Sequence, residues 1–321
     1  MFECSLVGGP AADFSVAFMA SRGDHAALSQ LGSANITSPP RDNPGWTRIH
    51  HFAQSWADTT SSLNHTVEEV WLEFDVCLTT ESSGNPPSVF FRLGYQSPQE
   101  PALRRGLSRE YVRVAKESFA ILEGTPMPPA TLSTLAECFN LLPAHARILF
   151  LGAMISRGPG TVRVVASGLS LDDMVHYLRR LGLDEESLGH LALITNISHR
   201  TSHLWLAIDV GETGVNPRIG FDCYYNNPAE SAKNRKWKDL LDFFVDNGIC
   251  TVNKRNALLR ATDMSNRKFD ELAWPGSLRR ISKLLGPAGF NSIGLHIHHV
   301  KVIDRPGRPP EAKAYLCGNY Q

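Results

Sequence analysis

The sequence predicts an α+β fold: a ten-stranded antiparallel β-barrel with a solvent-filled lumen, surrounded by helices. Two observations predict it. Five times along the chain, two alternating strands are joined by turn residues, and helical segments lie between successive hairpins. Each strand is also apolar on one face and polar on the other. A closed barrel buries the apolar faces under helices, turns the polar faces inward and leaves no unpaired edge.

The five hairpins follow from period-two alternation that is interrupted by glycine- and proline-rich turns. In the last hairpin, Lys313 and Tyr315 share one face while Ala312 and Ala314 share the other. The predicted arms are, in chain order, Phe2–Val7 with Ala12–Ala20, Glu69–Val76 with Ser88–Tyr95, Arg147–Ile155 with Val162–Ala166, His203–Val210 with Arg218–Tyr225, and Gly294–Ile303 with Glu311–Cys317. Such a barrel is wider than the roughly eight-stranded barrel that side chains alone fill, so we expect a ligand chamber.

Helical periodicity and helix-start signals occupy the intervals between the hairpins. Ser170 is a predicted N-cap because Asp172 and Asp173 follow it in the first turn, and Gly182 ends that helix. The predicted helical segments are Asp24–Leu31, Trp46–Leu63, Ser108–Glu123, Pro129–Leu142, Ser170–Leu181, Asp184–Leu193, Ala232–Asn247, Val252–Thr262 and Leu278–Leu285. These segments supply the cover that the apolar strand faces need.

The composition fits a single domain that spans residues 1–321. Apolar residues make up 42% of the chain, enough for a large core, and 32 basic residues balance 32 acidic ones. The balanced charge predicts no nucleic-acid partner. No apolar run reaches about 18 residues, so no membrane span is expected. The six cysteines include no CxxC pair, which favours reduced thiols and a cytoplasmic location. We expect a monomer or a homodimer.

The alternation assigns a set of polar and aromatic side chains to the lumen. They are Glu3, Trp71, Glu73, Asp75, Arg92, Arg147, Arg163, Trp205, Asp209, Arg218, Asp222, Tyr224, Lys301, Lys313 and Tyr315, with one or more of His296, His298 and His299. Guanidinium and ammonium groups bind phosphate oxygens, whereas tyrosine and tryptophan faces stabilise a carbocation and exclude water. This pattern, in a chain without a DDxxD, GxxxxGKS, GxSxG or HExxH motif, favours a diphosphate site built from basic residues.

Four short motifs lie on the predicted strands: Phe2-Glu-Cys-Ser5, Trp71-Leu-Glu-Phe-Asp75, His299-Val-Lys-Val302 and Glu311-Ala-Lys-Ala-Tyr-Leu316. In these motifs and in its hairpin order, the chain resembles the ααββ-barrel (ABBA, or PT-barrel) prenyltransferases, and more narrowly the cyanobactin-type peptide prenyltransferases. The resemblance implies an enzyme that transfers a dimethylallyl or geranyl group from its diphosphate to a side chain of a macrocyclic ribosomal peptide. It implies isoprenyl diphosphate as co-substrate, no prosthetic group, and Mg²⁺ as an optional aid.

The resemblance and the luminal alternation together assign roles. Glu3 matches the acidic residue that acts as base in the family. The expected diphosphate ligands are Arg92, Arg147, Arg163, Arg218, Lys301 and Lys313; the expected carbocation shield is Trp205, Tyr224 and Tyr315; and the expected polar contacts are Glu73, His296 and His298. Gly220 faces inward between Arg218 and Asp222, where the missing side chain leaves room for an isoprenoid tail. In the family that the chain resembles, a small residue in this part of the barrel goes with longer donors, so the resemblance favours geranyl over dimethylallyl diphosphate as the donor.

Two other classes of function remain open from the sequence. One is a non-catalytic barrel that binds a peptide or a phosphorylated ligand. The other is a metal-dependent oxygenase that uses His296 and His298, although no third ligand is evident and no metal site is expected. Glu73 and Asp75 also have a simpler interpretation, in which they only neutralise luminal arginines.

The first hairpin differs from the others because no helical segment precedes it in the sequence. Its outward residues include Phe2 or Cys4, with Phe14, Val16 and Phe18. Left bare, they would form an apolar patch of a few hundred Å². We therefore expect the segment from Asp24 to Leu63, a second copy of the chain, or helices upstream of this numbering to cover the patch.

Overall fold

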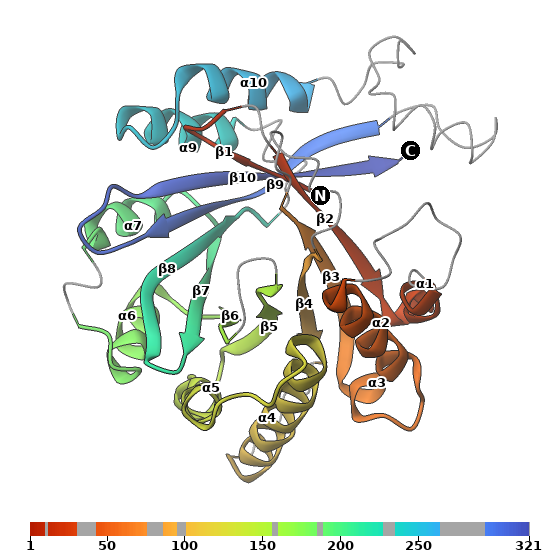
Figure 1. The fold of residues 1–321 in the computed structure, drawn as a ribbon. Coiled ribbons are helices and arrows are strands. Elements are labelled where there is room, and N and C mark those ends of the chain that lie inside the picture. Colours follow the sequence, from red (N-terminus) through yellow and green to blue (C-terminus); the bar gives the residue numbers. More distant parts are fainter. Residues whose placement is uncertain are drawn as a thin grey trace, which may run out of the picture.

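The computed structural model describes residues 1–9, 12–30, 43–75, 86–94, 101–155, 160–184, 189–226, 235–263 and 293–320. The strands are β1 (Phe2–Ser5), β2 (Ala12–Met19), β3 (Val67–Phe74), β4 (Ser88–Leu93), β5 (Arg147–Ala153), β6 (Val162–Ser167), β7 (His203–Gly211), β8 (Gly214–Tyr224), β9 (Ile293–Asp304) and β10 (Glu311–Tyr320). They form a closed barrel in the order β1-β10-β9-β8-β7-β6-β5-β4-β3-β2 (Figure 1). The predicted ten-stranded barrel is confirmed.

All neighbouring strands pair antiparallel, and the barrel closes where the two ends of the chain meet. β1 lies between β2 and β10, with Glu3 opposite Asp13 on one side and opposite Tyr315 on the other. Two strands more than 300 residues apart in sequence therefore share one wall. This closure brings Glu3 beside the side chains of the last hairpin.

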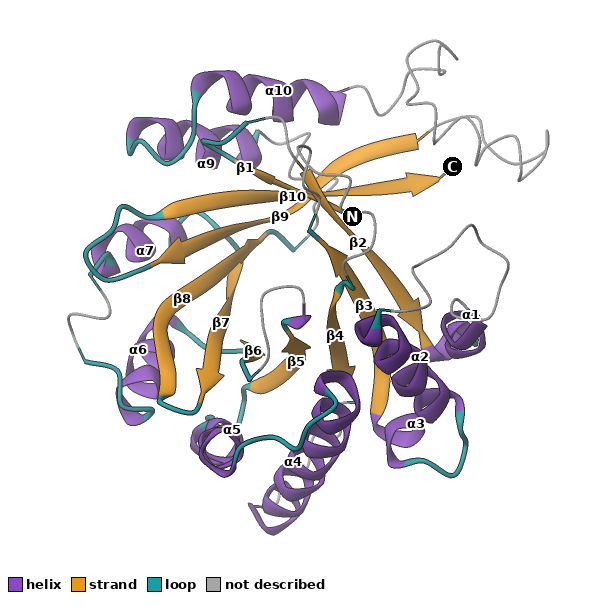
Figure 2. Ribbon diagram, viewed as in Figure 1, coloured by secondary structure: helices purple, strands orange, loops and turns teal. Residues whose placement is uncertain are grey.

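Helices surround the barrel on its outer face (Figure 2). They are the 3-10 helix η1 (Ala20–Arg22) and the α-helices α1 (Asp24–Gln30), α2 (Pro44–Ala57), α3 (Ser62–Thr66), α4 (Pro101–Glu123), α5 (Pro129–Leu141), α6 (Leu171–Arg180), α7 (Leu191–Ser198), α9 (Lys236–Asp246) and α10 (Val252–Asp263). Among the closest contacts, α1 packs on β2, α3 on β3, α4 on β5, α5 on β7 and β8, and α10 on β9.

The main apolar core lies between the helices and the outward faces of the strands. Phe91 of β4 is fully buried between Phe52 of α2 and Phe119 of α4, with ring centroids 5.8 Å away in both cases. Outward residues such as Val70 and Leu72 of β3 are equally inaccessible. Each strand therefore has its apolar side outward, which leaves its polar side for the lumen.

Local sequence signals explain where several helices begin and end. The predicted cap of α6 is confirmed: Oγ of Ser170 accepts a hydrogen bond from the backbone N–H of Asp173 at 3.1 Å, and the Asp173 carboxylate accepts one from the N–H of Ser170 at 3.0 Å. The single helix predicted from Trp46 to Leu63 is wrong. It is divided into α2 and α3 because Asp58 turns the chain, accepting from the N–H of Thr60 at 2.8 Å.

The helix predicted at Asp184–Leu193 is also misplaced, because α7 runs from Leu191 to Ser198. Ile194 and Ile197 are the buried residues of α7, and both lie beyond the predicted end. The segment predicted at Leu278–Leu285 lies outside the described residues. So does the beginning of the helix predicted from Ala232, of which α9 forms the later part.

The expected cover over the first hairpin is only partly present. Phe18 packs against the core, but Phe2, Phe14 and Val16 are 42%, 36% and 41% exposed. The Phe14 ring stacks on Phe74 with centroids 4.5 Å apart. The described part of the segment from Asp24 to Leu63 therefore does not cover the whole patch, because α2 packs on α1 and α4.

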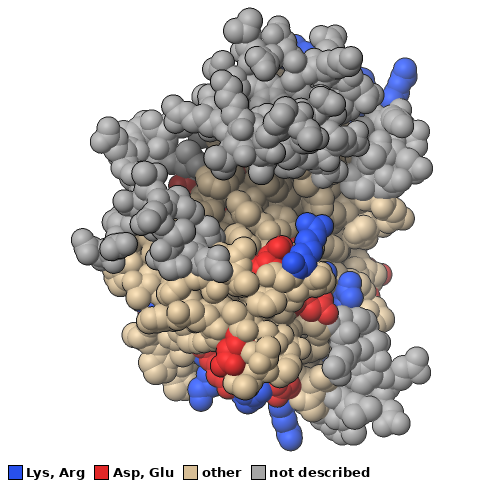
Figure 3. Space-filling view, turned by 90° about the vertical axis from the view of Figure 1, so that its right-hand side faces the viewer, with Lys and Arg blue, Asp and Glu red and all other residues tan. Residues whose placement is uncertain are grey.

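Among the residues that the structure describes, neither the charge distribution on the surface nor the helices depart from what the composition predicts. On the face drawn in Figure 3, basic and acidic side chains of the described residues lie close to one another, so neither sign forms an extended field. Over the part of the chain that the structure describes, no helix combines the length and apolarity that a membrane crossing requires.

Candidate functional site

Alternate residues of β8 point into the lumen and mark successive positions along the barrel. Arg218, Gly220, Asp222 and Tyr224 are successive inward positions, separated by about 6.6 Å at the usual rise of ~3.3 Å per residue. Cross-strand pairing places Arg163 opposite Asp209, Lys301 opposite both Asp222 and Lys313, and Tyr315 opposite His299. Together with ion-pair and ring contacts, this pairing defines three groups, which we call the arginine level (Arg163, Asp209, Arg218), the lysine level (Asp222, Lys301, Lys313) and the aromatic level (Trp205, Tyr224, His299, Tyr315). Trp205 lies opposite Asp222 in the register and joins the aromatic level through its ring contact with Tyr224.

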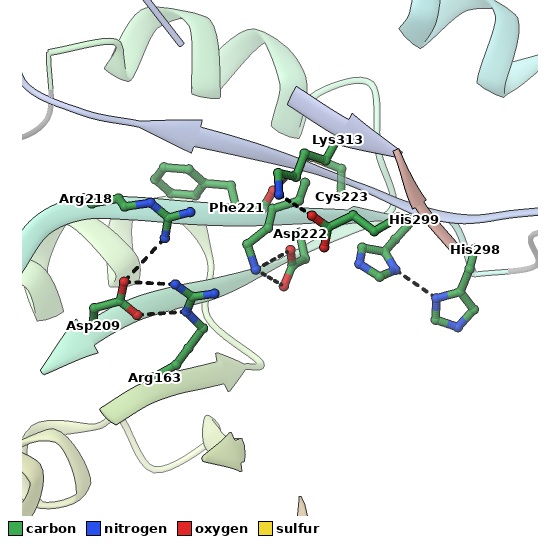
Figure 4. Close-up of polar contacts among 11 residues, drawn as sticks. Arg163, Asp209, Arg218, Phe221, Asp222, Cys223, His298, His299 and Lys313 are labelled. Carbon is green, nitrogen blue, oxygen red and sulfur yellow. Dashed lines mark hydrogen bonds and ion pairs between the residues drawn. The ribbon is translucent and has the colours of Figure 1, made fainter. Parts of the chain in front are cut away.

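The arginine level is a buried ion-pair network. Arg163 binds Asp209 through two parallel bonds, Nε to Oδ1 at 2.7 Å and a terminal nitrogen to Oδ2 at 2.9 Å, and Arg218 approaches Oδ2 at 3.3 Å (Figure 4). Burial raises the pKa of Asp209, but the hydrogen bonds and charge of Arg163 outweigh burial and hold that pKa below its ordinary value. Two guanidinium groups thus share one carboxylate, which leaves this level with excess positive charge.

The lysine level lies next along the barrel. Nζ of Lys301 is 3.1 Å from the nearer carboxylate oxygen of Asp222, its direct partner across β8 and β9. A Cβ added to Gly220 would lie 2.7 Å from Cε of Lys301 and 3.2 Å from Cβ of Ala207. The space beside Gly220, where an isoprenoid tail is expected, is therefore occupied by the Lys301 methylene chain in this structure.

Lys313 connects the lysine level to Glu3 on β1. Its ammonium forms an ion pair and hydrogen bond with the Glu3 carboxylate, which is only 6% exposed. Burial raises the pKa of Glu3, yet the charge and hydrogen bond of Lys313, together with a hydrogen bond from Tyr315, bring it below its ordinary value. Glu3 is therefore ionised at neutral pH and firmly held.

The aromatic level is a continuous row of rings across four strands, tilted between Trp205 and Tyr224 and stacked from Tyr224 through His299 to Tyr315. Ring centroids are 4.1 Å apart for Trp205 and Tyr224, 4.8 Å for Tyr224 and His299, and 4.1 Å for His299 and Tyr315. Burial, together with nearby carboxylates, raises the pKa values of Tyr224 and Tyr315 well above the ordinary range, so both phenols stay neutral. The stack presents aromatic faces and edges to the lumen, the surface that a carbocation prefers.

A β-bulge in the last hairpin brings two adjacent histidines into the lumen. Tyr315 pairs with His299 but Leu316 pairs with Ile297, so His298 is the extra residue on β9. Strict alternation would turn His298 away from His299; instead both line the cavity, and their Nδ1 atoms are 2.8 Å apart. His296 pairs with Cys317 and does not contribute to the cavity wall.

The opposite wall, on β3 and β4, carries a separate ion pair. Nε of Arg92 is 3.0 Å from Glu69, and Glu69 also accepts a 2.7 Å hydrogen bond from the indole of Trp71. Arg147, at the start of β5, lines the cavity near its exposed end, and Glu73 lines it as well. Asp75 lies just beyond the end of β3.

These walls enclose a cavity of about 330 Å³. It is bordered by Met1, Ser15, Glu69, Trp71, Glu73, Phe90, Arg92, Arg147, Leu149, Phe150, Arg163, Val165, Trp205, Asp222, Tyr224, His298, His299, Lys301 and Tyr315. Arg218 is connected to this wall through Asp209, which binds Arg163, and Glu3 is connected to it through a hydrogen bond with Tyr315. Lys313 is paired with Glu3. The volume is at the lower end of the range typical for small-molecule sites.

The barrel thus brings together most of the side chains that alternation assigned to the lumen. Sequence reasoning missed Glu69, although it lies two residues before Trp71 on the same face of β3 and period-two alternation was the signal for it. It also assigned no function to Asp222 or His299. Neutralisation of luminal arginines was foreseen for Glu73 and Asp75 only. The pairs formed by Asp209, Asp222 and Glu3 were not foreseen, because alternation specifies a face and not a cross-strand partner.

The candidate metal ligands do not converge. In the portion of the chain that the structure describes, no group of three His, Cys, Asp or Glu side chains is arranged to hold a metal ion. Among the histidines, His298 contacts His299, whereas the oxygenase hypothesis pairs it with His296.

Comparison with known proteins identifies the architecture. No protein-family model and no curated protein matches the sequence. Among solved structures, the chain is similar to AnaPT from Neosartorya fischeri, an ABBA prenyltransferase, with a TM-score of 0.51 and 12% sequence identity over 98% of this chain and 76% of AnaPT. At that identity the similarity is one of fold, and it confirms the expected ABBA barrel.

Proposed function

We propose that this protein is a prenyltransferase that moves an allylic isoprenyl group from its diphosphate to a side chain of a macrocyclic ribosomal peptide. The observation that carries the proposal is the order of the lumen, in which two arginines at one end are followed by lysines and then by stacked aromatic rings. This order matches the polarity of an allylic diphosphate, whose anionic head continues into an apolar tail. The ABBA fold supports the general reaction, and the short motifs support the peptide acceptor.

The proposed donor site uses the charge excess of the arginine level together with the ammonium groups of the lysine level. Arg163 and Arg218 share Asp209, so this group carries two guanidinium charges against one carboxylate, and guanidinium groups bind phosphate oxygens. Lys301 supplies a further ammonium group. The diphosphate needs these cations in order to leave, because the C–O bond that breaks places its electron pair on the diphosphate. Arg92, Arg147 and Lys313 are the remaining proposed ligands.

The proposed reaction centre is the aromatic level. The rings of Trp205, Tyr224 and Tyr315 stabilise the allylic cation and restrict the access of water, which would otherwise intercept it. By the resemblance, Glu3 is the base that receives the proton of the acceptor. Its ionised carboxylate, held by Lys313, also places negative charge beside the developing cation.

The experiment that tests the proposal is an incubation of the protein with dimethylallyl or geranyl diphosphate and cyclic peptides that carry Trp, Tyr, His or Arg. Mass spectrometry should show a peptide that has gained one isoprenyl group. Parallel reactions with EDTA and with Mg²⁺ determine whether the metal assists. Donor binding without any product would instead support the non-catalytic binding barrel, and absence of donor binding would contradict the proposal.

A further inference from the structure

Trp71 belongs to a second aromatic wall, which faces the aromatic level across the cavity. We propose that Trp71 positions the acceptor by stacking on it, so that the acceptor is a planar side chain, aromatic or guanidinium, and not an aliphatic hydroxyl. The inference rests on the proposed function and names the class of acceptor for the same site. It depends on where Trp71 lies relative to the donor, on the contacts that hold its ring, and on the small residues beside it.

The closed strand order places this second wall across the barrel from the aromatic level. Four strands separate β3 from β8 in either direction around the barrel, and four likewise separate β4 from β9 (Figure 1). Trp71 of β3 and its cross-strand partner Phe90 of β4 both line the cavity, as do Tyr224 of β8 and His299 of β9. A side chain that enters the cavity can therefore lie between two aromatic walls.

The proposed donor leaves this side of the cavity to the acceptor. The diphosphate lies at the arginine level, and the allylic carbons lie against Tyr224 and Tyr315. The acceptor atom has to approach the reacting carbon from a side that the donor and these two rings do not occupy. The wall formed by Trp71 and Phe90 borders that side of the cavity.

Hydrogen bonding holds the indole ring of Trp71. Its Nε1–H donates to Oε1 of Glu69 at 2.7 Å, and the other carboxylate oxygen of Glu69 lies 3.0 Å from Nε of Arg92. Glu69 is only 5% exposed, and hydrogen bonds are electrostatically stronger in such a buried environment than in water. Trp71 itself is half-buried at the cavity wall. Glu69 and Arg92 are therefore positioning residues that hold a ring surface ready for a ligand.

Small residues on the neighbouring strands give the two rings their space. Ala17 of β2 lies opposite Trp71, and Gly152 of β5 lies opposite Phe90. A Cβ added to Gly152 would lie 2.5 Å from the Phe90 ring, closer than two carbon atoms in van der Waals contact. The ring of Phe90 therefore lies over the backbone of Gly152. Residues that project little into the cavity thus border the Trp71–Phe90 pair on both sides.

A ring surface of this kind selects a planar partner. An indole attracts another aromatic ring through offset or edge-to-face contacts, and its negative face attracts a guanidinium group. A planar group that stacks on Trp71 presents its opposite face to the allylic carbon. A serine or threonine hydroxyl gains neither contact, so nothing in this wall would orient it. Glu3 remains the proposed base in this arrangement.

The test is a double-mutant cycle between residue 71 and the acceptor. It uses a cyclic peptide with Trp, Tyr, His or Arg that the unmodified protein prenylates, and the same peptide with leucine in place of that residue. Calorimetry measures the binding of both peptides in the presence of geranyl thiolodiphosphate, which occupies the donor site without transfer. We expect Trp71→Leu to weaken binding of the first peptide by about 10-fold and that of the leucine peptide far less, with donor affinity unchanged.

Two further variants complete the experiment. Trp71→Phe keeps a ring at this position without the indole N–H, so it should retain most of the preference for the planar peptide. Phe14→Leu is the matched control, because Phe14 stacks on Phe74 and is partly exposed on the outer face of the neighbouring strand β2. This variant should bind both peptides as the unmodified protein does.

The possible outcomes separate stacking from other roles of Trp71. An equal loss of affinity for both peptides in Trp71→Leu would show a purely structural role and overturn the inference. A lower kcat with unchanged peptide affinity would also overturn it, because Trp71 would then belong to the carbocation shield. Transfer to peptides whose acceptor is serine or threonine would contradict it as well. Absence of product from the unmodified protein with every peptide would instead contradict the proposed function itself.

Discussion

The Glu3–Lys313 ion pair links the two ends of the chain. In the proposed reaction, Glu3 mainly affects the rate of transfer and Lys313 mainly affects donor binding. Glu3→Gln removes the charge beside the carbocation but leaves the cations of the donor site, so we expect kcat to fall by about 100-fold with little change in donor affinity. Lys313→Ala should mainly weaken donor binding. Steady-state kinetics and calorimetry check both variants, with Glu110→Gln on the exposed face of α4 as control. Equal kcat for Glu3→Gln and the unmodified protein would remove Glu3 from the mechanism.

Asp209 is the residue whose loss should most affect stability within the arginine level. Asp209→Asn leaves Arg163, which is nearly inaccessible, without the carboxylate that it binds at 2.7 and 2.9 Å. Removal of one partner from a buried pair typically costs about 3 kcal/mol. Urea unfolding should show this loss, while Glu212→Gln, in the exposed turn of the same hairpin, should have no measurable effect. An unchanged free energy of unfolding in Asp209→Asn would show that the Arg163–Asp209 pair does not stabilise the fold.

At the residue scale, the sequence predicts which side chains enter the lumen but not how they pair. Alternation is a property of one strand, and it places Arg163 and Asp209 correctly without relating them. The Arg163–Asp209 bonds depend on the register between β6 and β7, which is a tertiary property. The same limit explains Gly220, whose empty side-chain position was expected to hold a donor tail but accommodates the Lys301 methylene chain.

Substitutions at Gly220 of β8 test whether this position belongs to the donor site. A Cβ at residue 220 would meet Cε of Lys301 at 2.7 Å, so Gly220→Ala should displace that side chain from Asp222 and weaken donor binding. Gly220→Phe should abolish geranyl transfer. Gly211→Ala is the matched control on β7, because the nearest atom to its added Cβ is 3.9 Å away. Full geranyl transfer by Gly220→Phe would exclude residue 220 from the donor site.

β9 should make the stability of the protein depend on pH. The pKa of His299 is far below the ordinary value of 6.5 in the folded chain, so the unfolded chain binds an additional proton as pH falls below 6.5. The free energy of unfolding should therefore decrease between pH 6.5 and 5, by up to about 1.4 kcal/mol per pH unit for this residue. His299→Phe keeps a ring between Tyr224 and Tyr315 and should flatten this dependence.

Urea denaturation at several pH values measures the slope, and the exposed His51→Phe serves as its control. An identical slope in His299→Phe and in the unmodified protein would show that this imidazole does not titrate between the folded and unfolded states.

At the element scale, hairpins were more predictable than helices. A strand that is polar on one side and apolar on the other has a two-residue period, which is visible even in short segments. The bulge at His298 was not predictable, because it appears only when β9 is aligned with β10. The division between α2 and α3 was missed because apolar spacing continues through Leu63, although the run from Asp58 to Ser61 consists of turn-forming residues.

At the scale of the whole molecule, closure of the barrel produces the site. No single strand contains a diphosphate site or an aromatic chamber: the three levels combine side chains of β6 to β10, and Glu3 joins them only when β1 meets β10. The sequence predicts this closure because a closed barrel buries the apolar strand faces under helices, turns the polar faces inward and leaves no strand edge unpaired. It does not predict the exposed Phe2, Phe14 and Val16, because their cover depends on how α1 and α2 pack.

The central claim is that the lumen binds an isoprenyl diphosphate with its charged head at the arginine level and its tail at the aromatic level. A crystal structure with a non-hydrolysable geranyl thiolodiphosphate tests this claim most directly. We expect phosphate oxygens within hydrogen-bond distance of Arg163 and Arg218, and the allylic carbons against the rings of Tyr224 and Tyr315. A ligand bound outside the barrel, or bound inside it with the diphosphate beside His298, would contradict the account.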